Sequence, residues 1–199
     1  MSHKPITIVL ATKNQNKIKE IKTILGADIH YQTIGDFLNI ETKEVGKSLL
    51  ENSIAKAAFS FKTSDKPSLA DDSGLFVEAL HGEPGVYSSR YGKTDNARIT
   101  KLLKNLEDPK NRKAKFKAVF VYYYAQGKYE IFEGECIGRI ALEACGSGGF
   151  GYDPIFIPEG YDKTFAELGP KIKNRISHRA KALAKFKKYL ENKYSKRNI

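Results

Sequence analysis

Residues 6–25 read ITIVLATKNQNKIKEIKTIL, and this stretch decides the fold. Its opening residues, 6–11, form an uninterrupted apolar and β-branched run, which is typical of a strand buried on both faces. A polar segment over 12–17 follows, and apolar residues then recur at helical spacing until Gly26, a residue type common just after a helix ends. The chain therefore begins with a strand, a polar loop and a helix, which is the opening of an α/β fold.

The rest of the sequence alternates between helical and strand patterns. Ser48 and Glu51 form the S-x-x-E capping box that begins a helix, and two aromatic, β-branched runs around Gln126-Gly127 are typical of an antiparallel hairpin. We expect a second helix from Ser48, a third over about 96–106, hairpin strands over 116–124 and 128–136, a strand over 153–157 ending at Pro158, and an amphipathic helix over about 177–194. The sequence predicts one mixed α/β domain over 1–199.

The composition is that of a folded chain. Its 199 residues and 22.3 kDa suffice for one core or two small lobes. The apolar fraction of 41% is too high for a disordered chain. The sequence has no apolar run of the roughly 20 residues that a membrane span needs and no signal-peptide pattern. We therefore expect a soluble, cytoplasmic protein with no membrane partner.

The net charge of +11 favours a polyanionic partner such as nucleic acid. Its distribution argues against that partner, because 11 of the 34 basic residues and only one of the 23 acidic residues lie in 171–199. The body of the chain, 1–170, is therefore close to neutral. A basic nucleic-acid-binding protein stays an alternative, but we expect a small anion and no nucleic acid.

The cysteines and histidines give no metal pattern. Cys136 and Cys145 match no zinc-binding spacing, and the four histidines are scattered. We expect two buried, reduced thiols and no zinc site.

The polar loop over 12–17 is the first candidate site. It carries Lys13 and Lys17 at a helix N-terminus, where backbone N–H groups and the helix dipole favour an anion such as phosphate. The loop lacks the G-x-x-x-x-G-K-[ST] pattern of a P-loop. The alternative is an ordinary helix start that is capped by Asn14 or Asn16.

Asp71 and Asp72 are the second candidate, because they interrupt an apolar segment just before Gly74. Adjacent carboxylates repel one another unless they share a cation or a proton, and Mg²⁺ binds such oxygens together with phosphate oxygens. Glu44 or Glu41, in the preceding acidic segment, is a further candidate ligand. The alternative is an Asx-turn in which Asp72 stabilises a chain reversal at Gly74.

Residues 146–151, GSGGFG, satisfy the G-x-G-x-x-G pattern, but the residues that follow predict a strand and not the helix that a dinucleotide fingerprint needs. We expect a glycine-rich loop that lets the backbone approach a ligand, with Phe150 for stacking and Asp153 for a polar contact. A plain hairpin loop is the alternative.

The start of the basic C-terminal helix is the last candidate. Lys173, His178 and Arg179 lie near it and present donors that suit an acceptor-rich ligand. The far end, 185–197, is expected to be a solvated charged face.

Six sequence blocks, taken in order, closely resemble the inosine/xanthosine triphosphate pyrophosphatase (Ham1-like) family, nearer its bacterial branch. The resemblance implies a long twisted mixed β-sheet flanked by helices, with two lobes around a central cleft. It also implies a homodimer that hydrolyses ITP, dITP and XTP with Mg²⁺ to the monophosphate and pyrophosphate, and so clears deaminated purines from the nucleotide pool. One departure is Lys13, where bacterial relatives usually carry glycine. The blocks are Thr12-x-Asn14-x-x-Lys17-x-x-Glu20, Gly46-x-x-x-x-Glu51-Asn52, Leu69-Ala70-Asp71-Asp72-Ser73-Gly74-Leu75, Gly85-Val86-Tyr87-Ser88-Ser89-Arg90-Tyr91, Gly148-Gly149-Phe150-Gly151-Tyr152-Asp153-Pro154-Ile155-Phe156 and Ser177-His178-Arg179.

The resemblance also implies roles for residues of this sequence. Asp72 is implied as the proton acceptor and as a metal ligand together with Glu44, whose rival is Glu41. Attack on the α-phosphate needs neutralised charge, an aligned water and removal of a proton, which adds Asp71 and Lys17 to the catalytic set. The implied substrate-binding residues are Thr12, Lys13, Asn14, Gln15, Asn16, Lys17, Ser73, Phe150, Gly151, Tyr152, Asp153, Lys173, His178 and Arg179.

Selection of the base follows as a hypothesis from these donors. Hypoxanthine and xanthine present a 6-oxo acceptor where adenine presents a 6-amino donor, so donors from Lys173, His178 or Arg179 favour ITP and XTP over ATP. A different Mg²⁺-dependent nucleotide phosphatase, which releases orthophosphate, stays an alternative.

Overall fold

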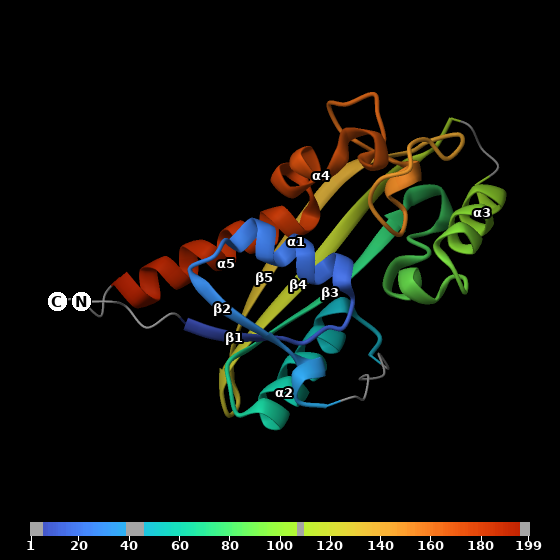
Figure 1. Cartoon of the computed structure of the whole chain (residues 1–199). Helices are drawn as coiled ribbons and strands as arrows, with labels where there is room; N and C mark the ends of the chain where they lie inside the picture. The colour runs from blue at the N-terminus through green and yellow to red at the C-terminus, as the bar shows by residue number, and fades with distance from the viewer. Residues whose placement is uncertain (1–5, 39–45, 107–109, 196–199) are drawn as a thin grey trace. The chain divides into compact units, whose positions relative to one another are not determined.

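A mixed six-stranded sheet with helices around it organises the chain (Figure 1). The computed structural model describes residues 6–38, 46–106 and 110–195. Within these residues the strands lie in the order β2-β1-β3-β4-β5-β6. Strand β1 is parallel to β2 and β3, whereas β5 is antiparallel to β6. The mixed α/β fold with a flanked sheet is therefore confirmed.

The strands are β1 (Ile6–Leu10), β2 (Ile29–Thr33), β3 (Ser68–Val77), β4 (Lys113–Ala125), β5 (Lys128–Ile140) and β6 (Phe156–Pro158). The α-helices are α1 (Gln15–Leu25), α2 (Leu49–Ser64), α3 (Asp95–Asn105), α4 (Phe165–Ile176) and α5 (His178–Ser195). The described part of the chain also contains the 3₁₀ turns η1 (Ile34–Asp36), η2 (Glu78–Leu80), η3 (Gly85–Arg90) and η4 (Asp153–Ile155).

The first two predicted helices form where their end signals lie. Gly26 ends α1 with a φ of 90°, a conformation that glycine adopts without strain. The Ser48 hydroxyl accepts the backbone N–H of Glu51 and caps α2 as predicted. The other half of the capping box differs, because the Glu51 carboxylate accepts the backbone N–H of Lys47 at 2.8 Å.

Other predictions need correction. β3 runs unbroken through Asp71 and Asp72, so the chain reversal at Gly74 is wrong. The strand expected over 153–157 is a 3₁₀ turn followed by the short β6, because Pro154 cannot donate a hydrogen bond to a ladder. Strand β2 and helix α4 are not predicted, although Thr164 and Glu167 begin α4 with a full capping box.

The prediction of two buried thiols is right for one of them. Both cysteines are free, but only Cys136 is buried, because Cys145 lies in a partly exposed loop. Among the described residues, no helix is long and apolar enough to cross a bilayer.

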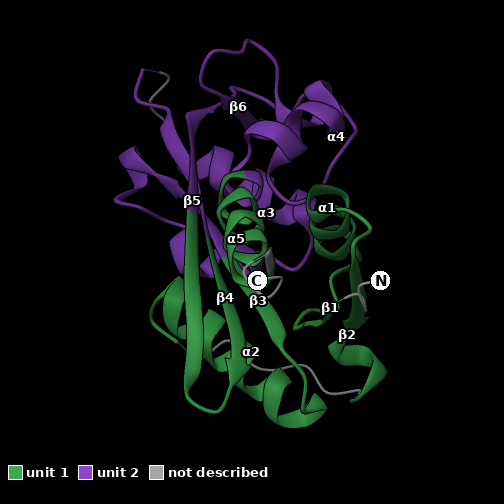
Figure 2. Cartoon of the chain, turned by 90° about the vertical axis from the view of Figure 1, so that its left-hand side faces the viewer, with its two compact units in different colours: residues 1–72, 119–133, 181–199 green, residues 73–118, 134–180 purple. Residues whose placement is uncertain are grey.

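The chain divides into two compact units (Figure 2). Unit 1 is Met1–Asp72, Val119–Glu133 and Lys181–Ile199, and unit 2 is Ser73–Ala118 and Gly134–Ala180. The boundaries therefore fall inside β3, β4, β5 and the first turn of α5.

The core of unit 1 uses the alternating side chains of β4. Val121 and Tyr123 pack in one cluster with Ala57 of α2, whereas Tyr122 packs against Phe186 of α5, with ring centroids 5.1 Å apart. Because neighbouring strand residues point to opposite faces, α2 and α5 cover opposite faces of β4 in unit 1. The core of unit 2 gathers buried side chains of α3, β3, β4, β5, η4, β6 and α4.

Candidate active site

The loop between β1 and α1 carries the first predicted cluster. Asn14 is the N-cap of α1, and its side-chain oxygen accepts the backbone N–H groups of Asn16 at 3.0 Å and Lys17 at 3.2 Å. The Thr12 hydroxyl accepts the N–H of Asn14 at 3.2 Å. Asn14 is therefore the helix cap, as the alternative predicts, and the backbone N–H groups of Asn14, Asn16 and Lys17 have acceptors within the loop.

Lys17 connects this loop to β3. Its Nζ lies 3.0 Å from Oδ2 of Asp71, and the two side chains are 15% and 0% exposed. Lys13 and Gln15 belong to the same loop, where the Gln15 amide donates to the Lys13 carbonyl at 3.4 Å. The predicted residues 12–17 thus lie together in one short segment. From this segment the ammonium group of Lys17 reaches the buried carboxylate of Asp71.

The two aspartates of β3 point to opposite faces, because they are consecutive residues of one strand. Asp71 faces Lys17 of α1. Asp72 accepts hydrogen bonds from two side chains of α2, Asn52 Nδ2 at 2.9 Å and Lys56 Nζ at 3.3 Å. Both aspartates are buried. Each carboxylate therefore has its own lysine, and these two separate pairs offset the repulsion expected between the adjacent aspartates.

Helix α2 holds Asp72 through a small network. Lys56 Nζ also donates to the main-chain carbonyl of Asp71 at 2.6 Å. The Asn52 carbonyl oxygen accepts the backbone N–H of Gly46 at 2.8 Å, and a Cβ at Gly46 would lie 2.6 Å from that oxygen. Because so close an approach excludes a side chain, glycine at 46 is part of how Asn52 and Asp72 are fixed.

The predicted metal ligands are only partly described. Glu44 and Glu41 lie outside the described residues. Within 6–38, 46–106 and 110–195, no group of three or more His, Cys, Asp or Glu side chains is arranged to hold a metal. Asp72 offers carboxylate oxygens, and Mg²⁺ characteristically takes one or two protein carboxylates and completes its shell with water and substrate phosphates. Asp72 therefore fits Mg²⁺ as one protein ligand of such a shell.

Asp153 organises the glycine-rich loop in unit 2. Its Oδ2 accepts Lys173 Nζ at 2.6 Å and the backbone N–H of Phe150 at 2.9 Å. The Asp153 and Lys173 side chains are 3% and 4% exposed, which makes this a buried ion pair. A Cβ at Gly149, whose φ is +76°, would collide with the Asp153 carboxylate. The hydrogen bonds of Asp153 therefore fix the conformation of the glycine-rich loop, which is more than a plain hairpin connection.

Phe150 has two cations beside its ring. Lys173 Nζ lies 4.3 Å and Arg179 Cζ lies 5.2 Å from the ring centroid. Arg179 also donates to the Ser73 hydroxyl at 2.9 Å. Phe150 is half-buried, whereas Lys173 and Arg179 are each 4% exposed. The predicted residues therefore meet as a partly exposed aromatic ring flanked by two buried positive charges.

His178 and Tyr152 lie deeper in the same unit. The His178 ring stacks on Phe116, with centroids 4.6 Å apart and planes 12° apart. The Tyr152 hydroxyl donates to the backbone carbonyl of Ser88 at 3.0 Å. Burial raises the pKa of Tyr152, so the phenol keeps its proton and remains a donor at neutral pH.

Four residues at these sites are not predicted by the sequence, namely Asn52, Lys56, Ser88 and Asp95. Asn52 and Lys56 are spaced i, i+4, which places them on one face of α2 and is a signal that sequence reasoning can use. Ser88 accepts the backbone N–H of Leu75 at 2.8 Å. Asp95 accepts the N–H of the predicted Gly151 at 2.7 Å across 56 residues of sequence, and no sequence signal indicates it.

The fold is that of an α/β protein, and each unit carries a site typical of an enzyme. The lysine-paired carboxylates of unit 1 suit phosphate chemistry, and the cation-flanked aromatic ring of unit 2 suits a flat ring. The chain belongs to the Ham1 family, whose model matches residues 8–189. The dITP/XTP pyrophosphatase of Aquifex aeolicus is 46% identical over 198 residues, which cover 93% of this chain and 96% of that protein. A dITP/XTP pyrophosphatase of Thermus thermophilus is 48% identical over 182 residues, 88% of this chain and 87% of that protein. A HAM1 protein from Coxiella burnetii has a similar structure, with a TM-score of 0.87 at 39% identity over 94% of this chain and 99% of that one.

Proposed function

We propose that this protein hydrolyses ITP, dITP and XTP to the monophosphate and pyrophosphate. Its membership of the Ham1 family and its similarity to dITP/XTP pyrophosphatases support this activity. The observation that carries the proposal is the pair of buried carboxylates on β3, each with its own lysine, Asp71 with Lys17 at 3.0 Å and Asp72 with Lys56 at 3.3 Å.

In the proposed reaction a water molecule attacks the α-phosphorus. The bond from that phosphorus to the bridging oxygen breaks, and pyrophosphate leaves with the oxygen. Asp72 takes the proton of the water, because the Asn52 amide and the Lys56 ammonium stabilise its ionised form and fix its orientation. Asp71 positions Lys17, whose ammonium donates hydrogen bonds to phosphate oxygens.

The charge balance of this cluster supports a divalent cation. Lys17 and Lys56 are each offset by an aspartate, so these four side chains together add little net positive charge for a triphosphate. Mg²⁺ supplies charge neutralisation of this kind when bound. Asp72 is proposed as one ligand and Glu44 as another, with Glu41 as the rival of Glu44.

The base is proposed to bind the residues of unit 2. Phe150 offers a partly exposed ring for stacking on a purine. Arg179 and Lys173 are donor-only side chains, so they suit the 6-oxo acceptor of hypoxanthine or xanthine and leave the 6-amino group of adenine unmatched. His178 is proposed as a third contact at this end, and Tyr152 and Gly151 as supports of the Phe150 loop.

We also propose a cytoplasmic homodimer whose partner is a nucleotide and not a nucleic acid. The exposed side of α5, with Lys181, Lys185 and Lys188, supports the view that much of the +11 charge is solvated. Leu183 and Phe186 of the same helix are buried, as the amphipathic pattern predicts.

The test is an assay of products. The purified protein is incubated with ITP, dITP, XTP, ATP and GTP in Mg²⁺, and pyrophosphate is measured separately from orthophosphate. We expect pyrophosphate, with ITP, dITP and XTP preferred, and loss of activity in EDTA that Mg²⁺ restores. Orthophosphate as the only product would show instead a different nucleotide phosphatase, and full activity of Asp72→Asn would refute the proposed site.

A further inference from the structure

Ser88 of η3 is a buried residue to which the proposed function gives no role. Its hydroxyl accepts the backbone N–H of Leu75 at 2.8 Å and donates to the carbonyl of Gly85 at 2.6 Å. Its main-chain carbonyl accepts the Tyr152 hydroxyl at 3.0 Å. One residue therefore connects β3, the turn η3 and the end of the glycine-rich loop through three hydrogen bonds.

The segment that leads to Ser88 lies close along β3. Phe76 and Pro84 form an antiparallel bridge. A Cβ at Gly74 would collide with the carbonyl oxygen of Gly85, and Gly85 itself has a φ of +53°, a conformation that favours glycine. Glycine at these two positions lets η3 lie against β3 and brings the Ser88 hydroxyl to the strand.

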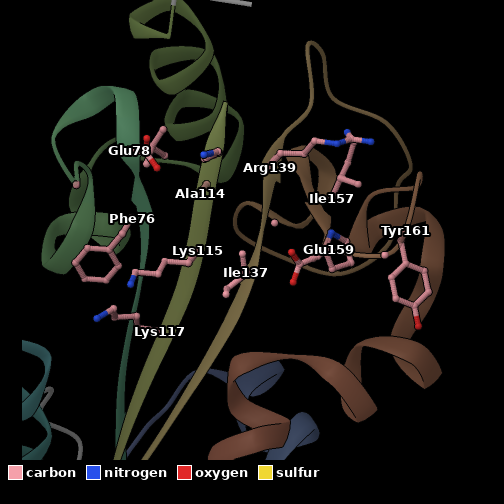
Figure 3. A pocket seen from close by; sticks show the side chains of 16 residues that line it. Phe76, Glu78, Ala114, Lys115, Lys117, Ile137, Arg139, Ile157, Glu159 and Tyr161 are labelled. Atoms are coloured by element: carbon pink, nitrogen blue, oxygen red, sulfur yellow. The ribbon is translucent and has the colours of Figure 1, made fainter. Parts of the chain in front are cut away.

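The contacts of Ser88 are separate from a cavity in the same unit. This cavity has a volume of about 700 Å³ and lies over β3, β4, β5 and β6 (Figure 3). Phe76 of β3 is among the side chains that line it, but Ser88 and Tyr152 are not. Ser88 and Tyr152 are 6% and 4% exposed, so a hydrogen bond lost there leaves a buried polar group unsatisfied.

The two segments that Ser88 joins are those that hold the proposed base site. One is β3, where the Ser73 hydroxyl accepts a hydrogen bond from Arg179 at 2.9 Å. The other is the glycine-rich loop, which carries Phe150. The Arg179 Cζ lies 5.2 Å from the centroid of the Phe150 ring. A base that stacks on this ring and accepts from this guanidinium needs the two at a fixed spacing, and the hydrogen bonds of Ser88 act on that spacing.

Ser88 differs from the other anchors of the loop. The backbone N–H of Phe150 donates to the carboxylate of Asp153 in η4 at 2.9 Å. The N–H of Gly151 donates to a carboxylate of α3 at 2.7 Å. The hydrogen bond from Tyr152 to Ser88 instead connects the loop to β3, because the Ser88 hydroxyl is bonded to that strand.

We propose that Ser88 is a positioning residue for base selection, which fixes η3 on β3, holds Tyr152 in place, and so keeps Phe150 and Arg179 at the spacing that a 6-oxo purine needs. The proposal rests on the proposed function and adds a residue that acts through the loop and the strand. Its structural half, the connection from Ser88 to the loop, is measured without a nucleotide.

The kinetic test uses Ser88→Ala and Tyr152→Phe, singly and together. Ser88→Ala removes the hydroxyl, whereas Tyr152→Phe removes the donor and keeps the ring. Each should raise KM for ITP about fivefold and lower the ratio of kcat/KM for ITP to that for ATP at least about threefold, with kcat changed less than about twofold. The double variant should show the effect of one substitution and not the product of two, because both break the same connection.

Hydrogen exchange of the free protein is the second readout. In both single variants the backbone N–H groups of residues 148–152 should exchange at least about fivefold faster than in the wild type, because the loop opens more often. Tyr152→Phe breaks the connection from the loop side, so it tests the proposal even where Ser88→Ala melts early. Circular dichroism melting measures the stability of each variant.

The chain offers a matched control for each substitution. Ser89→Ala changes the exposed neighbour of Ser88, and Tyr87→Phe changes a tyrosine that is 57% exposed. Both should leave KM, selectivity and exchange unchanged.

Three results would overturn the proposal. They are a lower melting temperature of Ser88→Ala and Tyr152→Phe with unchanged KM and selectivity, effects that multiply in the double variant, and unchanged exchange of the loop. A wild-type protein that releases no pyrophosphate from ITP would instead refute the proposed function, and the exchange data would still decide whether Ser88 holds the loop.

Discussion

The candidate sites of the two units consist of different kinds of side chain. In unit 1, two consecutive carboxylates of β3 are each held by a lysine of a neighbouring helix, Lys17 of α1 and Lys56 of α2. In unit 2, an aromatic ring, Phe150, lies beside Lys173 and Arg179. The first set suits proton and phosphate chemistry, and the second suits recognition of a flat ring. Changes in unit 1 should therefore lower kcat, and changes in unit 2 should alter KM and selectivity.

The largest expected effect is that of Asp72→Asn. Removing a positioned general base lowers kcat by roughly 10²- to 10⁴-fold, and the amide also loses its attraction to Lys56. Steady-state kinetics with ITP measure kcat and KM separately. Asp36→Asn in η1 is the matched control in unit 1 and should leave kcat unchanged. A loss confined to KM would contradict the division between the two units.

Lys56→Met should reduce both stability and kcat. The substitution keeps the aliphatic stem but removes the cation beside the carboxylate of Asp72, which is 5% exposed. Breaking a buried pair by removing one partner costs about 3 kcal/mol. Urea unfolding measures this difference, and Lys62→Met, at an exposed position of the same helix, should cost far less. Equal losses of unfolding free energy in the two variants would mean that the Lys56–Asp72 pair does not stabilise unit 1.

Arg179→Ala should change selectivity more than turnover. The variant removes the guanidinium that lies beside Phe150 and donates to Ser73. We expect the ratio of kcat/KM for ITP to that for ATP to fall at least about tenfold, because a site that donates to the 6-oxo group discriminates through that donor. Arg175→Ala, which removes an exposed arginine of α4, is the control. An unchanged ratio would refute the assignment of base selection to Arg179.

Asp95→Ala should have the smallest effect. Asp95 accepts a hydrogen bond from the backbone N–H of Gly151 in the Phe150 loop at 2.7 Å, and one such bond contributes about 1 kcal/mol. We expect KM for ITP to rise about fivefold at an unchanged kcat. Steady-state kinetics with ITP measure KM and kcat separately. A fall in kcat at an unchanged KM would show that Asp95 does not support substrate binding.

Local sequence signals predict the frame of this molecule well. The run over 6–11 and the helical spacing up to Gly26 give β1 and α1, and Gln126-Gly127 gives the turn between β4 and β5. These features depend on residues close in sequence, whose propensities and side-chain periods act locally. Pro154 also acts locally. The strand expected over 153–157 does not allow for this proline, which lies in the 3₁₀ turn η4 before the short β6.

The partners of the site residues are much harder to predict. The sequence places Asp71 and Asp72 side by side and invites a shared cation, whereas the period of a strand sends them to different helices. The contact from Asp95 to Gly151 joins distant segments through tertiary packing alone. Residue types in motifs thus predict which side chains matter, and only the fold assigns the side chain that each one meets.

The most direct test of the account is the position at which water enters the substrate. The protein is incubated with ITP in H₂¹⁸O and Mg²⁺, and the products of a single turnover are analysed by mass spectrometry. Attack on the α-phosphorus by water that Asp72 deprotonates predicts ¹⁸O in inosine monophosphate and none in pyrophosphate. Label in pyrophosphate, or in released orthophosphate, would contradict the account.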